Sequence, residues 1–331
     1  MKQKTNKTNS HSSGFLAFVK SEIEHQLHNG RIGIAKNYGC AHRSFSRFLS
    51  ERGKTDVSFQ KLNHVLMVDY ESWLRSRGVC KNTSSCYIRS LQAVYNKAVH
   101  SGIIDDRHPF QDTYRGVART KKRAISHDDI RRIYTLDIHA SLLAQGGKEG
   151  SRCFVKMKRQ LEFARDIFLF CFCSRGMTFV DFAHLRKTDI SNGIISYVRR
   201  KTHQRMQVQV EPIMQQIIDR YPSSTIYQFP LLTVTDDAEK LFRQYHYTIG
   251  WYNSCLSTLG KLLGGIHLTS YVSRHSWATA AYRQQLPLSV ISQSMGHDSE
   301  KTTEIYLKSL ESNAIDEANR YLIDNVFGTE K

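Results

Sequence analysis

Residues 294–306, SMGHDSEKTTEIY, place Tyr306 nine residues after His297. An earlier stretch, YVSRHSWAT at 271–279, places the pair Arg274 and His275 at the start of a helical segment, and Gly296 ends the next segment. A lone tyrosine among the 16 of this chain is most often a core or surface residue. The C-terminal part therefore holds a set of basic residues, Arg274, His275 and His297, with Tyr306 as the one candidate nucleophile.

The charge of the chain favours a polyanionic partner. The 331 residues hold 47 Lys and Arg against 30 Asp and Glu, a formal net charge of +17. The excess is spread along the chain, with +10 on residues 1–120 and +7 on residues 121–331. Such an excess predicts nucleic acid ahead of an acidic membrane surface, and favours both over a merely soluble basic protein, which could have the same charge.

Several classes of site find no support in the sequence. Phosphate-loop, zinc-protease, serine-hydrolase and paired Cys-x-x-Cys patterns are all absent. The seven cysteines have no metal-ligand spacing, and their odd number without a signal peptide indicates a reducing cytosol. The longest apolar run, IFLFCFC, is too short to span a bilayer. We therefore expect a cytoplasmic protein with no metal, no other cofactor and no membrane partner.

The chain divides into four segments. Residues 1–12 are a polar basic tail, residues 13–110 a helical bundle, residues 111–124 a basic linker, and residues 125–331 a second domain. The second domain reads as mostly helical with two strands, GIISYV and MQVQVEP, flanking the charged turn RRKTHQR. The predicted fold class is mainly α with a small antiparallel β-sheet, that is, α+β.

Helical periodicity predicts about four helices in the bundle. In AKNYGCAHRSFSRFL the apolar side chains fall on one face, and a later helix begins with a cap at Asn82 or Thr83 and ends at Gly102. Arg89 and Lys97 lie off its apolar stripe, so they form a solvated basic face or a surface facing phosphates. In the second domain, helices are expected after Ser126 and over 158–174, 212–220, 236–262 and 311–323, with a flexible loop within 139–151.

The C-terminal pattern resembles that of the tyrosine site-specific recombinases, the phage-integrase family. That family has H-x-x-R-H, then L-G-H, then a tyrosine nine residues after the last histidine, where this chain has YVSRH and SMGHDSEKTTEIY. VRRKTHQRMQVQV is similar to its strand–turn–strand, and SRGMTFVDFAHLRKTDI to its first arginine segment. The resemblance covers residues 13 to 323 and implies a helical core-binding domain before a catalytic domain.

The resemblance implies a role for each matched residue. Tyr306 is the nucleophile that forms a 3′-phosphotyrosyl bond, Arg274 clamps the phosphate, and Lys201 is the general acid. His297 hydrogen-bonds the phosphate or the tyrosine, and His275 supports the site. Lys201 could instead be an ordinary turn lysine, with Arg199 or Arg200 in its place, and His297 could only cap a helix.

Two positions depart from the family pattern. Tyr271 stands where the first histidine belongs, so proton transfer is expected to shift to His275. Thr178 stands in the arginine column, and the nearest arginine is Arg175, three residues earlier. On a continuous helix that spacing shares one face, whereas a break at Gly176 leaves the geometry open. We expect Arg175 to restore the phosphate contact rather than to form a structural pair with Asp181.

The resemblance also implies partners. These are duplex DNA and, because strand exchange cuts four strands, a tetramer on paired sites, with the helix at 311–323 docking on a neighbour or packing within its own chain. Basic residues expected on DNA are Arg89, Lys97, Lys121, Lys122 and Arg123. The variant motifs SRGMTFVD and YVSRHSWAT are similar to those of the family branch that is typical of Bacteroidetes. Members of this branch are integrases and DNA invertases, and the resemblance implies that the protein acts at the nucleoid. The alternatives are an inactive DNA-binding relative and a type IB topoisomerase.

Overall fold

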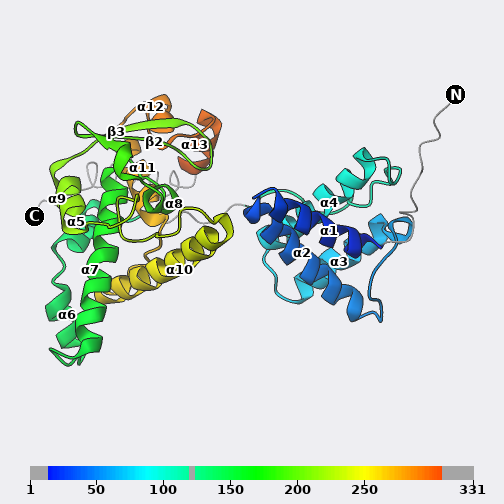
Figure 1. Ribbon diagram of the computed structural model, residues 1–331, viewed down its shortest axis with the longest axis horizontal. Helices are drawn as coiled ribbons and strands as arrows, with labels where there is room; N and C mark the ends of the chain where they lie inside the picture. Colours follow the sequence, from blue (N-terminus) through cyan, green and yellow to red (C-terminus); the bar gives the residue numbers. More distant parts are fainter. Residues whose placement is uncertain (1–13, 119–123, 308–331) are drawn as a thin grey trace, which may run out of the picture. The chain divides into compact units, whose positions relative to one another are not determined.

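The computed structural model describes residues 14–118 and 124–307, with side chains described up to residue 304. Its internal contacts divide the chain into two units, residues 1–120 and 121–331, each with its own hydrophobic core (Figure 1). None of the helices in the described ranges combines the length and the apolar character that crossing a bilayer requires. The predicted helix at 311–323 lies outside the described residues.

The first unit is the predicted helical bundle. Its elements are α1 (Phe15–His28), α2 (Ile32–Ser50), the short 3-10 helix η1 (Phe59–Lys61), α3 (His64–Ser76) and α4 (Lys81–His100). The apolar stripe predicted for α2 is buried over its whole length, at Tyr38, Ala41, Phe45, Phe48 and Leu49. The 3.6-residue period therefore identified the core-facing side of this helix correctly.

The start of α4 differs from the prediction. Cys80 is the N-cap, whereas Asn82 uses its side chain to bind the backbone of Ala118, as donor at 3.0 Å and as acceptor at 2.7 Å. The hydroxyl of Ser85 donates to the carbonyl of Gly116 at 2.7 Å. The first part of the expected linker, residues 111–118, thus packs on α4.

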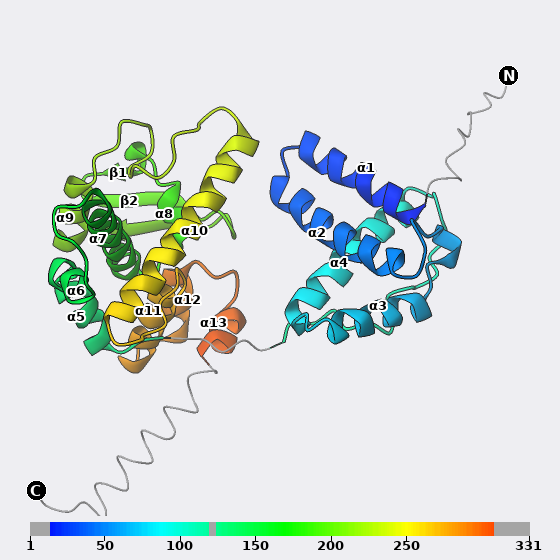
Figure 2. The same ribbon diagram turned by 90° about the horizontal axis from the view of Figure 1, so that it is seen from below.

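The second unit is mostly helical (Figure 2). Its helices are α5 (His127–Thr135), α6 (Ile138–Ala144), α7 (Arg152–Cys173), α8 (Phe179–Ala183), η2 (Lys187–Asp189), α9 (Pro212–Arg220), α10 (Ala238–Leu262), α11 (Val272–Arg283), α12 (Leu288–Met295) and α13 (Glu300–Leu307). The Ser126 capping box predicted from the sequence is present. Helix α6 takes up the start of the stretch expected to contain a loop, and residues 145–151 form that loop. Asp137 caps α6 by accepting from the Ala140 N–H at 2.9 Å.

The sheet is a three-stranded antiparallel meander. Strands β2 (Ile194–Val198) and β3 (Arg205–Gln209) are the two predicted from the sequence, and β1 (Ile190–Ser191) adds a short edge. In the β2–β3 register Ile195 lies opposite Val208, and both side chains are buried. The hairpin turn at 199–204 is thereby held at one end of the sheet.

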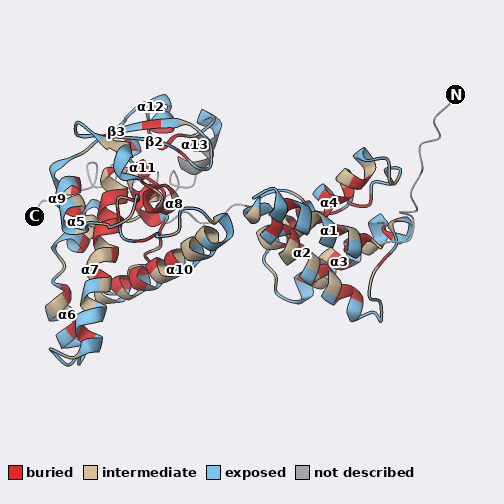
Figure 3. Cartoon of the chain, viewed as in Figure 1, coloured by how far each residue is buried: buried red, intermediate tan, exposed pale blue. Residues whose placement is uncertain are grey.

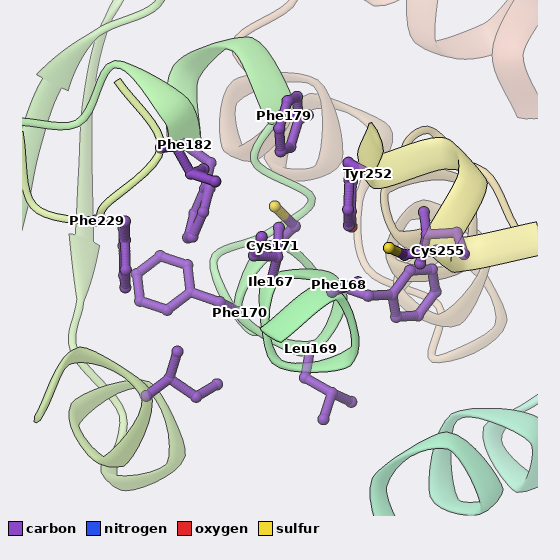
Figure 4. Packing of buried hydrophobic residues seen from close by; sticks show 14 of the residues in the cluster. Ile167, Phe168, Leu169, Phe170, Cys171, Phe179, Phe182, Phe229, Tyr252 and Cys255 are labelled. Atoms are coloured by element: carbon purple, nitrogen blue, oxygen red, sulfur yellow. The ribbon is translucent and has the colours of Figure 1, made fainter. Parts of the chain in front are cut away.

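Helix α7 forms the centre of the second core. Buried residues gather along α7 and α8 (Figure 3), and aromatic rings stack around the end of α7 (Figure 4). The ring centroids of Phe170 and Phe182 are 5.2 Å apart, and those of Phe179 and Tyr252 are 4.5 Å apart. This packing fixes both sides of the turn that joins α7 to α8.

A buried carboxylate ties α7 to α9. Asp166 is 2 % exposed and accepts hydrogen bonds from Arg165 at 3.0 Å, Arg220 at 2.6 Å and the Tyr221 hydroxyl at 2.8 Å. Burial, followed by the Asp166 charge, raises the pKa of Tyr221. Because these partners satisfy the carboxylate, this cluster is structural.

Candidate active site

Arg274 is the most deeply buried of the predicted catalytic residues whose side chains the structure describes. It lies in the first turn of α11, is 3 % exposed, and donates to the carbonyls of Gly176 at 2.7 Å and Met295 at 2.6 Å. Its Nη2 also lies 3.1 Å from Nε2 of His297. The α7–α8 turn and the end of α12 thus orient one guanidinium, as a phosphate clamp requires.

Gly176 allows the α7–α8 turn to approach Arg274. Its φ is +73°, and a Cβ added there would lie 3.0 Å from both Cα and Cγ of Arg274. A side chain at this position would meet both the left-handed backbone penalty and the packed arginine.

His297 follows the C-terminal turn of α12. Gly296 closes this helix with a φ of +61°, and His297 directs its Nδ1 at the Thr303 hydroxyl, 2.7 Å away. A guanidinium only donates, so Nε2 of His297 accepts from Arg274 and the proton lies on Nδ1. Thr303, which is fully buried in α13, therefore fixes the histidine ring. Thr303 belongs to the stretch SMGHDSEKTTEIY, but its spacing from His297 did not predict this contact.

The β2–β3 hairpin carries Lys201 to the same turn. Thr202 donates to the Gly296 carbonyl at 3.0 Å, and the Gln204 side chain donates to the His297 carbonyl at 3.0 Å. Lys201 is exposed and makes no hydrogen bond or ion pair with a described residue. Its ammonium is therefore available as a proton donor.

Thr178, which stands in the arginine column, binds a carboxylate of its own unit. It is buried and donates to the Asp181 carboxylate at 2.6 Å, and Asp181 also accepts from the backbone N–H of Arg200 at 2.9 Å. Burial, and then the Asp181 charge, raises the pKa of the neighbouring phenol of Tyr197. Asp181 thus joins α8 to the hairpin.

Arg175 does not share a helix with Thr178. Helix α7 ends at Cys173, and Arg175 itself has a φ of +59°, so the same-face argument does not apply. Its exposed side chain donates to the Gln207 carbonyl at 3.4 Å and lines a groove between the hairpin and α12. No described ion pair joins it to Asp181.

His275 and Tyr271 lie side by side on α11 and its N-cap. Their ring centroids are 5.9 Å apart, and Tyr271 is 47 % exposed. Tyr245 of α10 interacts electrostatically with Tyr271: burial, followed by the Tyr271 and Asp181 charges, raises the pKa of Tyr245 to about 12. No sequence motif pointed to Tyr245, because its neighbours come together only through the fold.

The remaining predicted residues fall in three places. Tyr306 lies in α13 three positions after Thr303, and its side chain is outside the described residues, as are Lys121, Lys122 and Arg123. Arg89 is exposed on α4. Lys97 forms an ion pair with Glu22 of α1 at 2.5 Å, which gives it a structural contact within the bundle.

Two family domains match the chain. Residues 14–115 match the phage integrase SAM-like domain, and residues 167–313 match the phage integrase family. A search of curated proteins gives no match.

Solved structures of DNA-bound recombinases share the fold. A lambda integrase dimer bound to a COC′ core site has 12 % identity and a TM-score of 0.60, over 89 % of this chain and 77 % of that one. A Tn1549 transposon integrase in complex with a circular intermediate DNA has 14 % identity and a TM-score of 0.61, over 92 % and 100 %. The XerH recombinase in a post-cleavage complex with a palindromic difH substrate has 12 % identity and a TM-score of 0.62, over 96 % and 99 %.

At these identities the structural likeness shows the fold alone. The segment that matches the SAM-like domain precedes a second unit in which arginine, histidine and a lysine-bearing hairpin meet at one turn. The chain therefore carries a phage integrase SAM-like domain followed by a phage integrase family domain, in the fold of the tyrosine recombinases.

Proposed function

We propose that this protein is a site-specific DNA recombinase that cuts and rejoins strands through a covalent 3′-phosphotyrosyl intermediate. The observation that carries the proposal is the joint placement of Arg274, His297 and the Lys201 hairpin around the end of α12, followed by the helix that contains Tyr306. A cationic pocket beside a tyrosine suits attack on a phosphodiester.

The proposed reaction assigns one step to each group. The Tyr306 oxygen attacks phosphorus, its proton passes to His275, and the bond to the 5′ oxygen breaks. Lys201 gives its proton to that leaving oxygen, while Arg274 binds the non-bridging oxygens and His297, which accepts from Arg274, orients that guanidinium. Arg175 is the candidate from the sequence for a further phosphate contact. Because the phosphotyrosyl bond retains the energy of the bond that was cut, rejoining requires no ATP.

We further propose that the reaction inverts, integrates or excises DNA segments and that four protomers assemble on two sites. The neighbours support this assembly by likeness of fold, among them a lambda integrase tetramer bound to a Holliday junction, with a TM-score of 0.57. No metal participates in this scheme, since protein cations stabilise the phosphate charge. The site of action would be cytoplasmic DNA.

A pool of nicked duplexes of random sequence provides the test. We expect labelled DNA that stays attached to the full chain in SDS, and we expect Tyr306→Phe to abolish it while binding persists. Sequencing of the attached DNA then defines the cognate duplex. Absence of any adduct would instead favour an inactive DNA-binding relative, and relaxation of supercoiled plasmid without a defined site would favour a type IB topoisomerase.

Paired sites in plasmids distinguish the reaction products. Two cognate sites in inverted orientation should invert the segment between them, and two in direct orientation should excise it. Both reactions should proceed in EDTA without nucleotide. Dependence on added magnesium or ATP would contradict the proposed chemistry.

A further inference from the structure

A second buried guanidinium lies in the site, at Arg199. The sequence places this residue in a charged turn, yet it is only 4 % exposed. Its Nη1 donates to the Gly296 carbonyl and, at 3.4 Å, to the Thr202 hydroxyl. Its Nε is buried without a hydrogen-bond partner, and the guanidinium forms no ion pair within the described residues. A buried guanidinium whose N–H has no acceptor raises the free energy of the folded protein, unless an anion binds there and accepts the hydrogen bond.

Arg199 and Arg274 converge on the same turn. Arg274 donates to the Met295 carbonyl, and Arg199 donates to the next carbonyl, that of Gly296. Both charges also act to lower the pKa of the Tyr197 phenol, against the larger effect of its burial. A Cβ added to Gly296 would lie 3.0 Å from Cδ of Arg199, so the stem of this arginine is closely packed.

We propose that Arg199 supplies the second guanidinium that neutralises a non-bridging oxygen of the scissile phosphodiester. This inference rests on the proposed recombinase function and extends it to a residue outside the family motif. The hydroxyl of Thr178 donates to Asp181, so it is not free to bind phosphate. Arg175 is exposed and donates to the Gln207 carbonyl of β3. Among the arginines that the structure describes, Arg199 is the one that combines burial, an unpaired Nε donor and a hydrogen bond to the residue before His297.

Arg199 forms no covalent bond in this scheme. As phosphorus becomes five-coordinate, negative charge grows on its equatorial oxygens, and a guanidinium already held in a dry site stabilises it without reorganising. A purely positioning role is the alternative, in which Arg199 only holds the Gly296 carbonyl and thereby His297. The two roles predict different reaction rates when the negative charge of the phosphate is removed: only the direct role makes the effect of losing Arg199 depend on that charge.

The test compares two versions of the cognate duplex selected by wild-type adduct formation. One carries the ordinary scissile phosphate, and the other carries a methylphosphonate there, which removes one negative oxygen. We expect Arg199→Met, which retains much of the stem, to slow adduct formation on the phosphodiester by about 100-fold. On the methylphosphonate, we expect its rate to return to within about threefold of the wild-type rate on that substrate.

Three comparisons decide the outcome. An Arg199→Met variant that is equally slow on both substrates overturns the proposal in favour of a positioning role. Recovery confined to Arg175→Ala or Arg200→Ala also overturns it, because a different arginine then faces the phosphate. Arg199→Lys, expected to be impaired less and to recover likewise, serves if the methionine variant unfolds, as judged by thermal unfolding and duplex binding. Failure of the wild type to form any adduct refutes the recombinase function itself, a separate result.

Discussion

Gly176→Ala should displace the phosphate clamp without removing any functional group. The new methyl group would occupy backbone with φ +73° and lie 3.0 Å from Cα and Cγ of Arg274. Left-handed backbone costs an L residue about 1–2 kcal/mol, and overpacking a filled site costs about 1–3 kcal/mol. The total, about 2–5 kcal/mol, corresponds to a fall of roughly 5–20 °C in the Tm of the second unit.

Gly193→Ala is the matched control. Gly193, in the turn between β1 and β2, has a φ of +72°, yet a Cβ added there meets nothing within 4 Å. This variant therefore incurs only the backbone cost, about 1–2 kcal/mol. The difference between the two variants isolates the contact with Arg274.

The assay is thermal unfolding together with the rate of adduct formation. Because the Gly176 carbonyl accepts from Arg274 at 2.7 Å, a shift of this turn moves the guanidinium, and a misplacement of about 1 Å costs about 100-fold in rate. We expect that loss for Gly176→Ala and a near-wild-type rate for Gly193→Ala. Equal Tm values and equal rates for the two variants would refute the argument that Gly176 lies too close to Arg274 to carry a side chain.

A buried carboxylate, a half-buried histidine and the charge of the chain supply the remaining predictions. Asp166→Asn should lower the unfolding free energy of the second unit by about 2–3 kcal/mol in urea denaturation. The control is Glu162→Gln, which removes an i,i+4 pair with Lys158 and should change this free energy by less than about 0.5 kcal/mol. Similar changes for the two variants would contradict a stabilising role of the buried Asp166 cluster. Burial, followed by the Arg200 charge, lowers the pKa of His184, so the unfolded state binds more protons and stability should fall as pH drops below 6.5. His184→Gln should flatten this slope, and an unchanged slope would exclude His184 as its source. Affinity for duplex DNA should fall steeply with salt in fluorescence anisotropy; a flat log–log plot would contradict binding through phosphates.

Long periodic elements were predictable because burial repeats along them. The stripe of α2 and the alternation in β3 both followed from spacing, and both matched the structure. Helix α6 was missed because its seven residues are too few for a clear period beside two glycines. Asn82 was expected as a cap from its residue type, but a tertiary contact with Ala118 takes its side chain.

The sequence predicted only those site residues that lie at short, regular spacings along the chain. Arg274, His297 and Thr303 meet because consecutive helices bring them together, and their order along the chain reflects this. Arg199 was not distinguishable from its neighbour Arg200 by sequence, since both belong to one charged run. The fold separates them by burying the first against Gly296 and leaving the second exposed.

The docking of the hairpin on the end of α12 has a mechanical consequence. Arg199, Thr202 and Gln204 bind two consecutive carbonyls, so the backbone of the hairpin that carries Lys201 is attached to the turn that carries His297. Helix α13 is attached to that turn as well, through Thr303. A displacement of α12 is therefore transmitted to the hairpin and to α13 together, so the residues proposed as acid and nucleophile would move as a unit rather than one by one.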